Sequence, residues 1–314
     1  MRYAHTTNVT ALTSAETNKL PLSARLIVPG LWGVSLALAY VSEKFEVGWL
    51  RILLFNGVFA MVACMGLELA FPYRADWNYP FRANWKAALA ELARDVLFLI
   101  PLRFCVLFCM YFLTPSISPI FYELGRKIGV GTIMAHAPLP LRLALSLVLS
   151  EVFLYWFHRG LHGIPLMWRL HFTHHQPLML TAAKSSRSHP FELVALYSLS
   201  AALSSLFAGS ASDTQWLLLI QVTANTLAHA NINVDCGRIY RAIFTGPELH
   251  RIHHSADMAD LSNFSCTIPV VDRIFGTLRT KPSREPMEVG VVPLRPRSLK
   301  EQLIDPLYKP TSEL

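Results

Sequence analysis

The chain has 314 residues, of which 53% are hydrophobic and only 16% are charged, and its mean hydropathy is +0.36. This composition is too apolar for an ordinary soluble domain and predicts a membrane protein. The formal net charge of +7 would suit nucleic acid, but no nucleic-acid motif accompanies it. The basic residues instead flank apolar runs, as in the cytoplasmic loops of membrane proteins, so we expect no nucleic-acid partner.

The first half of the chain alternates polar stretches with apolar runs. Residues 1–24 are polar and lack the apolar core of a signal peptide. Residues 25–157 contain four apolar runs, which predict four membrane crossings, and the Pro- and Ile-rich residues 114–140 are expected to form a loop. The four runs lie at about 26–41, 52–71, 96–113 and 141–157.

Basic residues set the expected orientation. Arg2, Lys19 and Arg25 near the N-terminus and the basic, aromatic segment 72–94 are expected to face the cytoplasm. Four crossings then return the chain to the cytoplasm at about residue 158. Two further runs, at about 193–207 and 216–227, predict a spanning or re-entrant hairpin, 193–228, that begins and ends on that side.

Histidine recurs at regular spacing in the second half of the chain. Ten of the twelve histidines lie between residues 158 and 254, mostly in the motifs HRGLH, HFTHH and HRIHH. Residues three and four apart share one face of a helix, so the histidines of each motif are expected to point toward one centre. These motifs contain His158, His162, His171, His174, His175, His250, His253 and His254.

The number of clustered histidines predicts two metal ions. Neutral imidazole is a ligand for iron, zinc and copper, and eight such ligands exceed what one four-coordinate zinc can use. His229 is a candidate ninth ligand, and His189 in RSHPFE is either a ligand or the partner of one. His5 and His136 lie outside the motifs, and we interpret them as ordinary surface or core residues.

The motifs exclude two familiar metal sites. No Glu-x-x-His pair of a carboxylate-bridged di-iron bundle occurs, and the HExxH motif of zinc proteases is absent. A histidine-rich dimetal site remains, with open positions for dioxygen. Redox-active iron suits the oxidation of an unactivated C–H bond, which side chains alone cannot perform. The five cysteines form no CxxC pair, and we interpret them as small core residues.

The three boxes resemble, in order and spacing, those of the fatty acid hydroxylase/sterol desaturase superfamily of integral-membrane di-iron oxygenases. The similarity covers about residues 145–280 and includes RSHPFE, LAHANI around His229 and SNFSCTIPVVDRIFGTL after the third box. It implies a single all-α domain, 1–314, in which four or more transmembrane helices and the hairpin lie under a cytosolic helical cap. The cap, within residues 158–280, would hold the dimetal site, and residues 281–314 form a tail.

The resemblance also implies the cofactors, ligands and partners. They are two iron ions, or zinc in an overexpressed sample, together with dioxygen and electrons from a ferredoxin or from cytochrome b5 with its reductase. Carried over by position, the eight box histidines and His229 become iron ligands. Fatty acyl hydroxylases of the superfamily have a further HX3H pair, whereas here Asn233 follows His229, so Asn233 is either a weak ligand or has no part. This departure favours the sterol-desaturase-like branch, which includes proteins similar to bacterial ornithine-lipid hydroxylases.

Other residues are candidates for supporting roles. Glu192, Asn263 and Asp272 could orient ligand imidazoles. A basic set near the third box is expected to dock an acidic electron carrier or to contact anionic lipid headgroups. The set consists of Arg238, Arg241, Arg251, Arg273, Arg279 and Lys281.

These observations predict a membrane-bound di-iron oxygenase that hydroxylates or desaturates a lipid C–H bond. The expected substrate is a fatty-acyl chain of a membrane lipid such as an ornithine lipid, or a sterol. A dizinc hydrolase and a metal transporter or sensor are the alternatives. A transporter would place its ligands near the bilayer midplane, whereas these histidines lie at or beyond the ends of apolar runs.

Overall fold

The computed structural model describes residues 22–45, 47–79, 84–185, 187–233, 236–285, 287–291 and 298–308. Within these ranges the chain is helical and forms no β-strand, which confirms the all-α prediction for this part of the chain. The first helices are α2 (Leu22–Lys44), α3 (Trp49–Ala70), α4 (Trp85–Phe108), α5 (Thr114–Lys127), α6 (Val130–Ala135), α7 (Leu139–Gly163) and α8 (Pro165–His175). They are followed by α9 (Pro190–Leu206), α10 (Ala211–Ala228), α11 (Gly237–Ile243), α12 (Pro247–His253), α13 (Val270–Ile274) and α14 (Leu299–Tyr308). The short turns are η1 (Ala75–Trp77), η2 (Cys109–Leu113), η3 (Ala182–Lys184) and η4 (Met258–Asp260).

The predicted apolar runs all lie in helices. Two stretches of the described chain, Ile52–Ala70 and Leu139–Gly163, are long and apolar enough to cross a membrane. Two others, Leu26–Val41 and Pro190–Leu206, are apolar but shorter. The predicted hairpin is formed by α9 and α10, which pack against each other. Part of the polar N-terminus, residues 1–21, lies outside the described residues.

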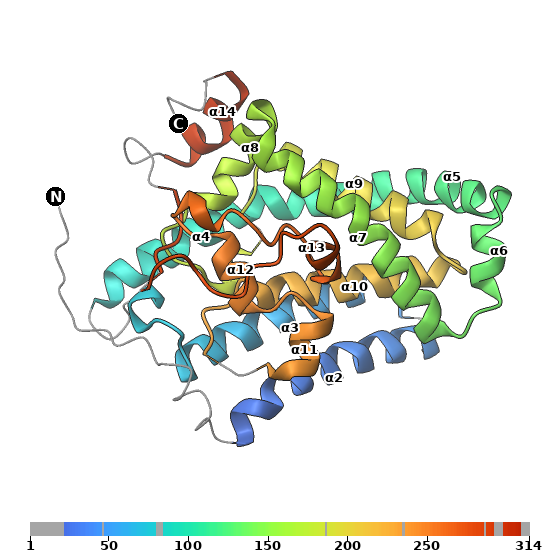
Figure 1. The fold of residues 1–314 in the computed structure, drawn as a ribbon, viewed down its shortest axis with the longest axis horizontal. Coiled ribbons are helices and arrows are strands. Elements are labelled where there is room, and N and C mark those ends of the chain that lie inside the picture. The colour runs from blue at the N-terminus through green and yellow to red at the C-terminus, as the bar shows by residue number, and fades with distance from the viewer. Residues whose placement is uncertain are drawn as a thin grey trace.

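The prediction of a loop over residues 114–140 is wrong. Helix α4 continues through the π-helical turn η2 into α5, and α6 follows after Gly129. Pro115 lies directly after η2, where the regular α-helical hydrogen bonding is already interrupted by the π-helical turn. Proline therefore lies within a continuous helix here and not in a loop, and α5 packs along α9 (Figure 1).

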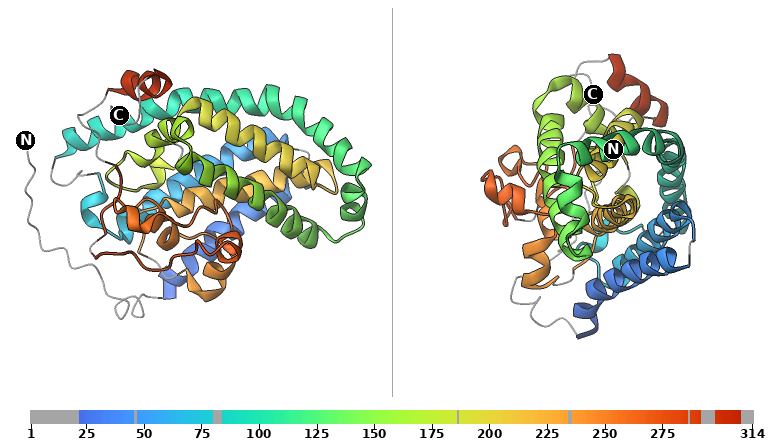
Figure 2. Two further views of the ribbon diagram at one scale, coloured as in Figure 1. Left: turned by 45° about the horizontal axis from the view of Figure 1, so that its top comes forward. Right: turned by 90° about the vertical axis from the view of Figure 1, so that its right-hand side faces the viewer.

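Helix α10 lies at the centre of the molecule. It packs against α2, α3, α7 and α9 and also against the short helix α12. The long helices run side by side, and α6 connects α5 to α7 at one end (Figure 1). Viewed along the bundle, α11, α12 and α13 gather on one flank (Figure 2). These short helices therefore cover one side of α7 and α10.

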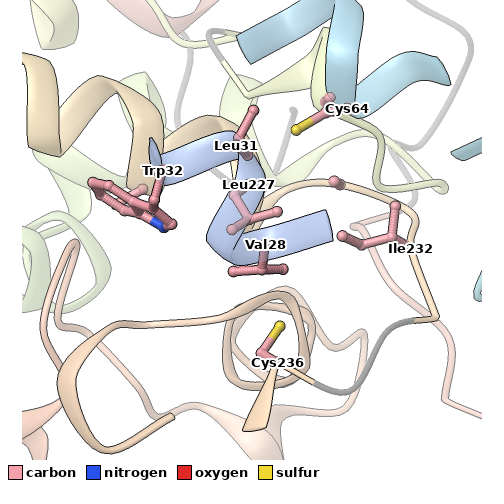
Figure 3. Packing of buried hydrophobic residues seen from close by; sticks show 10 residues of the cluster. Val28, Leu31, Trp32, Cys64, Leu227, Ile232 and Cys236 are labelled. Atoms are coloured by element: carbon pink, nitrogen blue, oxygen red, sulfur yellow. The ribbon is translucent and has the colours of Figure 1, made fainter. Parts of the chain in front are cut away.

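A buried cluster fixes the C-terminal end of α10. Leu227 and Ile232 pack against Val28 and Leu31 of α2 and against Cys64 of α3 (Figure 3). Burial of each large aliphatic side chain contributes roughly 1.5–3 kcal/mol. Because Leu227 precedes His229 by only two residues, this packing also fixes the backbone that carries the ring of His229.

Candidate metal centre

Nine histidines meet in two groups. In each group, one ring nitrogen per residue lies within 4.8 Å of the corresponding nitrogens of the others. Eight of the nine side chains are buried, and His162 is half-buried. The two groups therefore contain all eight box histidines together with His229. The first group is His158, His162, His171, His175 and His253, and the second is His174, His229, His250 and His254.

Each HxxHH box supplies both groups, which differs from the expectation that a box serves one centre. His171 and His175 of α8 lie in the first group, whereas His174 lies in the second. His250 and His254 lie in the second group, whereas His253 lies in the first. Adjacent residues on a helix point in different directions, so a box with two consecutive histidines can serve two centres.

Hydrogen bonds to one side of the rings fix how five of these histidines point. In each of the five, Nδ1 lies at hydrogen-bond distance from an oxygen, and in four of them that oxygen is a backbone carbonyl, which can only accept. Nδ1 therefore carries the proton and Nε2 presents a lone pair to the group. The partners are the Phe264 carbonyl for His158 (2.7 Å), Glu192 Oε1 for His171 (2.9 Å), the Arg187 carbonyl for His174 (3.2 Å), the Asn225 carbonyl for His229 (2.8 Å) and the Ser262 carbonyl for His253 (2.8 Å).

The facing lone pairs fit metal ions. Nε2 of His158 lies 3.2 Å from Nε2 of His171, and Nε2 of His174 lies 3.3 Å from Nε2 of His229. Two unprotonated nitrogens at this distance repel unless a cation lies between them. Metal–nitrogen bonds of about 2.0–2.1 Å place neighbouring ligands about 3 Å apart, which agrees with these distances. Nε2 of His253 is buried without a hydrogen-bond partner, as expected of a ligand atom.

Burial keeps the rings in the neutral form that binds metal. Desolvation lowers the pKa of His174, His250 and His254 well below its ordinary value, and the neighbouring imidazoles lower it further. The same cause lowers the pKa of His229 to about 4. Neutral imidazoles are ready to accept a metal ion without first losing a proton.

The three candidate supporting residues act at different distances from the rings. Glu192 contacts His171 directly. The carboxylate of Asp272 accepts from the backbone N–H groups of Phe264 and Ser265, so it fixes the loop whose Phe264 carbonyl contacts His158. Asn263 has a positive φ of 55° and follows Ser262, and its side chain donates to the carbonyls of Leu249 and Arg279. Asp272 and Asn263 therefore position the rings through the backbone.

The other candidate histidines and Asn233 lie elsewhere. His189 donates from Nε2 to the Leu303 carbonyl (2.9 Å) and accepts from the Phe191 N–H at Nδ1, so it caps α9 and contacts α14. Asn233 is half-buried, and its backbone N–H donates to the Phe71 carbonyl. In the described part of the chain, no hydrogen bond joins its side chain to a histidine. His136 is exposed, and His5 lies outside the described residues.

Three buried carboxylates that motif analysis missed connect the apolar helices to the site. Glu68 of α3 accepts from the backbone N–H groups of Ala182 (2.6 Å) and Asn231 (2.9 Å). Glu151 of α7 accepts from those of Cys266 and Thr267. Asp95 of α4 pairs with Lys184 (2.7 Å) and Arg187 (3.3 Å). For Glu68 and Glu151, a single acid within an apolar run was the available signal, because such a residue must have a partner.

The basic set near the third box does not form one surface. Arg251 is buried, lies over the ring of Tyr73 and donates to the Ala230 and Ile232 carbonyls, so it is not available for docking. Arg279 is half-buried and pairs with Asp260 (3.1 Å). Arg238, Arg273 and Lys281 are exposed, and Arg241 is half-buried.

The comparisons with known proteins agree with this geometry. The model of the family described as fatty acid hydroxylase matches residues 143–277, a range that contains all nine clustered histidines. Residues 143–277 are a fatty acid hydroxylase domain. No solved structure matches the chain.

Relatives of the hydroxylase domain carry several functional names. The chain is 26% identical to the ornithine lipid hydroxylase OlsE of Rhizobium tropici, over 55% of this chain and 52% of that protein. It is 24% identical to methylsterol monooxygenase 2-2 of Arabidopsis thaliana, over 51% of this chain and 60% of that protein. It is 28% identical to the very-long-chain aldehyde decarbonylase GL1-8 of Oryza sativa, over 41% of this chain and 49% of that protein. The chain spans about half the length of the relatives it matches.

Proposed function

We propose that this protein is a membrane-bound di-iron oxygenase that hydroxylates a C–H bond of a lipid. The observation that carries the proposal is the convergence of nine histidines into a group of five and a group of four, with Nε2 lone pairs directed inward. The family match supports the oxidative class over a dizinc hydrolase. The position of the groups at helix ends favours an enzyme over a transporter.

In this proposal the nine histidines hold two iron ions, which supply the activation of dioxygen when bound. The chain holds the imidazoles neutral, orients five of them through Nδ1 and keeps the groups buried from water. Hydroxylation consumes one dioxygen, two electrons and two protons, places one oxygen atom in the C–H bond and releases the other as water. Neutral imidazole ligands would leave the bound metal ions with their full positive charge.

The substrate is proposed to be a lipid such as an ornithine lipid or a sterol. The names of OlsE and of methylsterol monooxygenase support this class. A cavity beside the histidines has mostly apolar walls, which suits a hydrocarbon chain. Electrons are proposed to come from a ferredoxin or from cytochrome b5 with its reductase, docked near the exposed Arg238, Arg273 and Lys281.

The protein is proposed to cross the membrane several times, with the histidine groups on the cytoplasmic side. The two long apolar helices support membrane association. The excess of basic residues in 72–94 and in the C-terminal half supports the orientation.

Oxygen-isotope labelling tests the proposed reaction. Membranes from a host that expresses the chain are incubated under oxygen-18 gas, and their lipids are compared by mass spectrometry with those of a host expressing His254→Ala. We expect a lipid that gains one heavy oxygen atom only with the intact chain. Products that form equally without dioxygen, or that take oxygen only from water, would support a hydrolase instead.

A further inference from the structure

A cavity extends from the histidine groups between α7, α9 and α10. His158, His171, His174 and His250 line it where it meets the groups. On α10, Leu218, Gln221 and Asn225 line the same wall, because residues spaced by three, four and seven share one helix face. The seven-residue separation of Leu218 and Asn225 corresponds to about 10 Å along the axis. Much of the remaining wall is apolar and comes from Leu154, Phe157, Leu161, Leu193, Leu196 and Val222.

One part of this apolar wall carries polar atoms that have no partner in the protein. Gln221 Nε2 and Ser185 Oγ are both buried without a hydrogen bond, and both residues line the cavity. Asn225 Nδ2 donates to the Ser185 carbonyl (3.3 Å), which joins the two residues in one patch. A buried polar group without a partner costs free energy, so a bound group is expected to satisfy it.

The patch lies close to the reacting end of the cavity. The Asn225 carbonyl accepts from Nδ1 of His229, and Gln221 lies one turn farther along α10. No lysine or arginine lines the cavity in the described chain, and the carboxylate of Glu192 does. Among the side chains of the cavity, an anionic group would therefore meet no cationic partner, whereas a neutral oxygen meets a carboxamide and a hydroxyl, both of which donate hydrogen bonds.

We propose that Gln221 and Ser185 bind a neutral oxygen group, a hydroxyl or an ester or amide carbonyl, on the lipid chain that occupies this cavity. The two residues are then specificity determinants, and they fix the distance along the chain between that oxygen and the carbon held at the histidines. The inference rests on the proposed function for the role of the histidines, but binding can be measured without turnover.

Matched ligands test the patch. Full-length protein loaded with zinc in lipid nanodiscs is titrated with decanol, decane and decanoate, and the ratio of their apparent dissociation constants is compared between variants. Gln221→Met and Ser185→Ala each remove one polar group. Gln215→Met changes a half-buried glutamine of α10 that does not line the cavity. Zinc content and thermal unfolding confirm that each variant is folded.

The intact protein and Gln215→Met should prefer decanol over both decane and decanoate. Gln221→Met should lose about tenfold of the preference over decane, because one buried hydrogen bond disappears. If Gln221→Met does not fold, Ser185→Ala alone tests the inference, and it should also lower the preference for decanol over decane. Equal ratios in the intact protein and in both cavity variants would overturn the inference, even if lipid oxidation is observed. If Gln221→Met loses the preference for decanol but the intact protein oxidises no lipid, the inference is supported and the proposed function is refuted.

Discussion

Adjacent histidines in the two HxxHH boxes serve different groups, and this division is the main feature of the site at the scale of single residues. His174 and His175 are neighbours in sequence but lie in the second and first group respectively, as do His254 and His253. One box thus couples the geometry of both groups. Helical spacing in the sequence was enough to predict eight of these residues, but it could not predict how they divide. His229 has no box of its own, so it emerged from its place between the boxes and from the family resemblance.

Alanine variants test the division. His254→Ala removes one of four rings from the second group and should lower the metal content per chain, because each lost imidazole removes one metal–nitrogen bond. His175→Ala should lower it less, since four rings remain in the first group. Metal is measured by mass spectrometry on purified full-length protein. His189→Ala is the control, because its nitrogens contact Phe191 and Leu303, and a loss of metal there would contradict the assignment.

Buried carboxylates connect helices to distant loops, and the mean hydropathy of a helix does not reveal such contacts. Apolar runs predicted the long helices, and a lone acid within a run signalled a partner, but the sequence did not identify the loops around the histidines that Glu68 and Glu151 join to α3 and α7. Those contacts join residues far apart in sequence, so local periodicity cannot predict them. The same limitation applies to α5, where proline was interpreted as a loop former although the helix continues through it after the π-helical turn η2.

Replacement of Glu68 tests this connection. Glu68→Leu removes the acceptor for the Ala182 and Asn231 N–H groups, and each buried donor left without a partner costs about 1–3 kcal/mol. We expect hydrogen exchange at these two amides to accelerate by about ten- to a hundredfold. Glu68→Gln retains an acceptor oxygen and should change exchange much less. Equal protection in Glu68→Leu and the intact protein would show that the carboxylate does not connect these elements.

The junction of α9 and α14 should depend on pH through His189. Its Nδ1 accepts from the Phe191 N–H only when the ring is neutral. Burial lowers the pKa of His189 below its ordinary value, against smaller opposing effects of the Leu303 carbonyl and of Glu192. The unfolded ring takes up a proton near pH 6.5 while the folded ring resists it, so this contribution to stability is lost as pH falls. Limited proteolysis of α14 should accelerate between about pH 7.5 and 5.5.

His189→Asn provides the comparison for this effect. Asparagine accepts a backbone N–H at a helix N-cap and carries no titrating group. The variant should therefore show a flatter pH dependence of α14 cleavage than the intact chain. An identical pH dependence in both proteins would exclude His189 as its source.

Helices α8 and α12, which carry histidines of both groups, lie away from α6, which is at one end of the bundle (Figure 1). This separation makes the orientation of the whole molecule in the membrane testable. Met258 of η4 is 76% exposed, whereas Ser185, which lies near the groups, is buried and unsuitable for labelling. We predict that Met258→Cys reacts with an impermeant thiol reagent only after cells are permeabilised. His136→Cys, at the exposed end of α6, should react in intact cells. The reverse pattern would place the histidine groups outside the cytoplasm.

At the scale of the whole molecule, the sequence was sufficient to predict the class of protein but not how its elements pack together. Composition predicted a membrane protein, and box spacing predicted the oxidative family. The burial of Arg251 between Tyr73 and the carbonyls after His229 depends on tertiary packing, so the basic set could not be recognised from sequence as partly internal. Likewise, the cavity requires α7, α9 and α10 to meet, and no single segment encodes it.

The most direct test of the central claim is the iron content of active protein. Full-length chain is purified in nanodiscs, and iron and zinc per chain are measured together with dioxygen-dependent lipid oxidation. We predict about two iron ions per chain at full occupancy of the two histidine groups, activity that disappears on chelation, and recovery with ferrous iron but not with zinc. Full lipid oxidation by zinc-loaded protein, or by chains with only traces of iron, would contradict the claim.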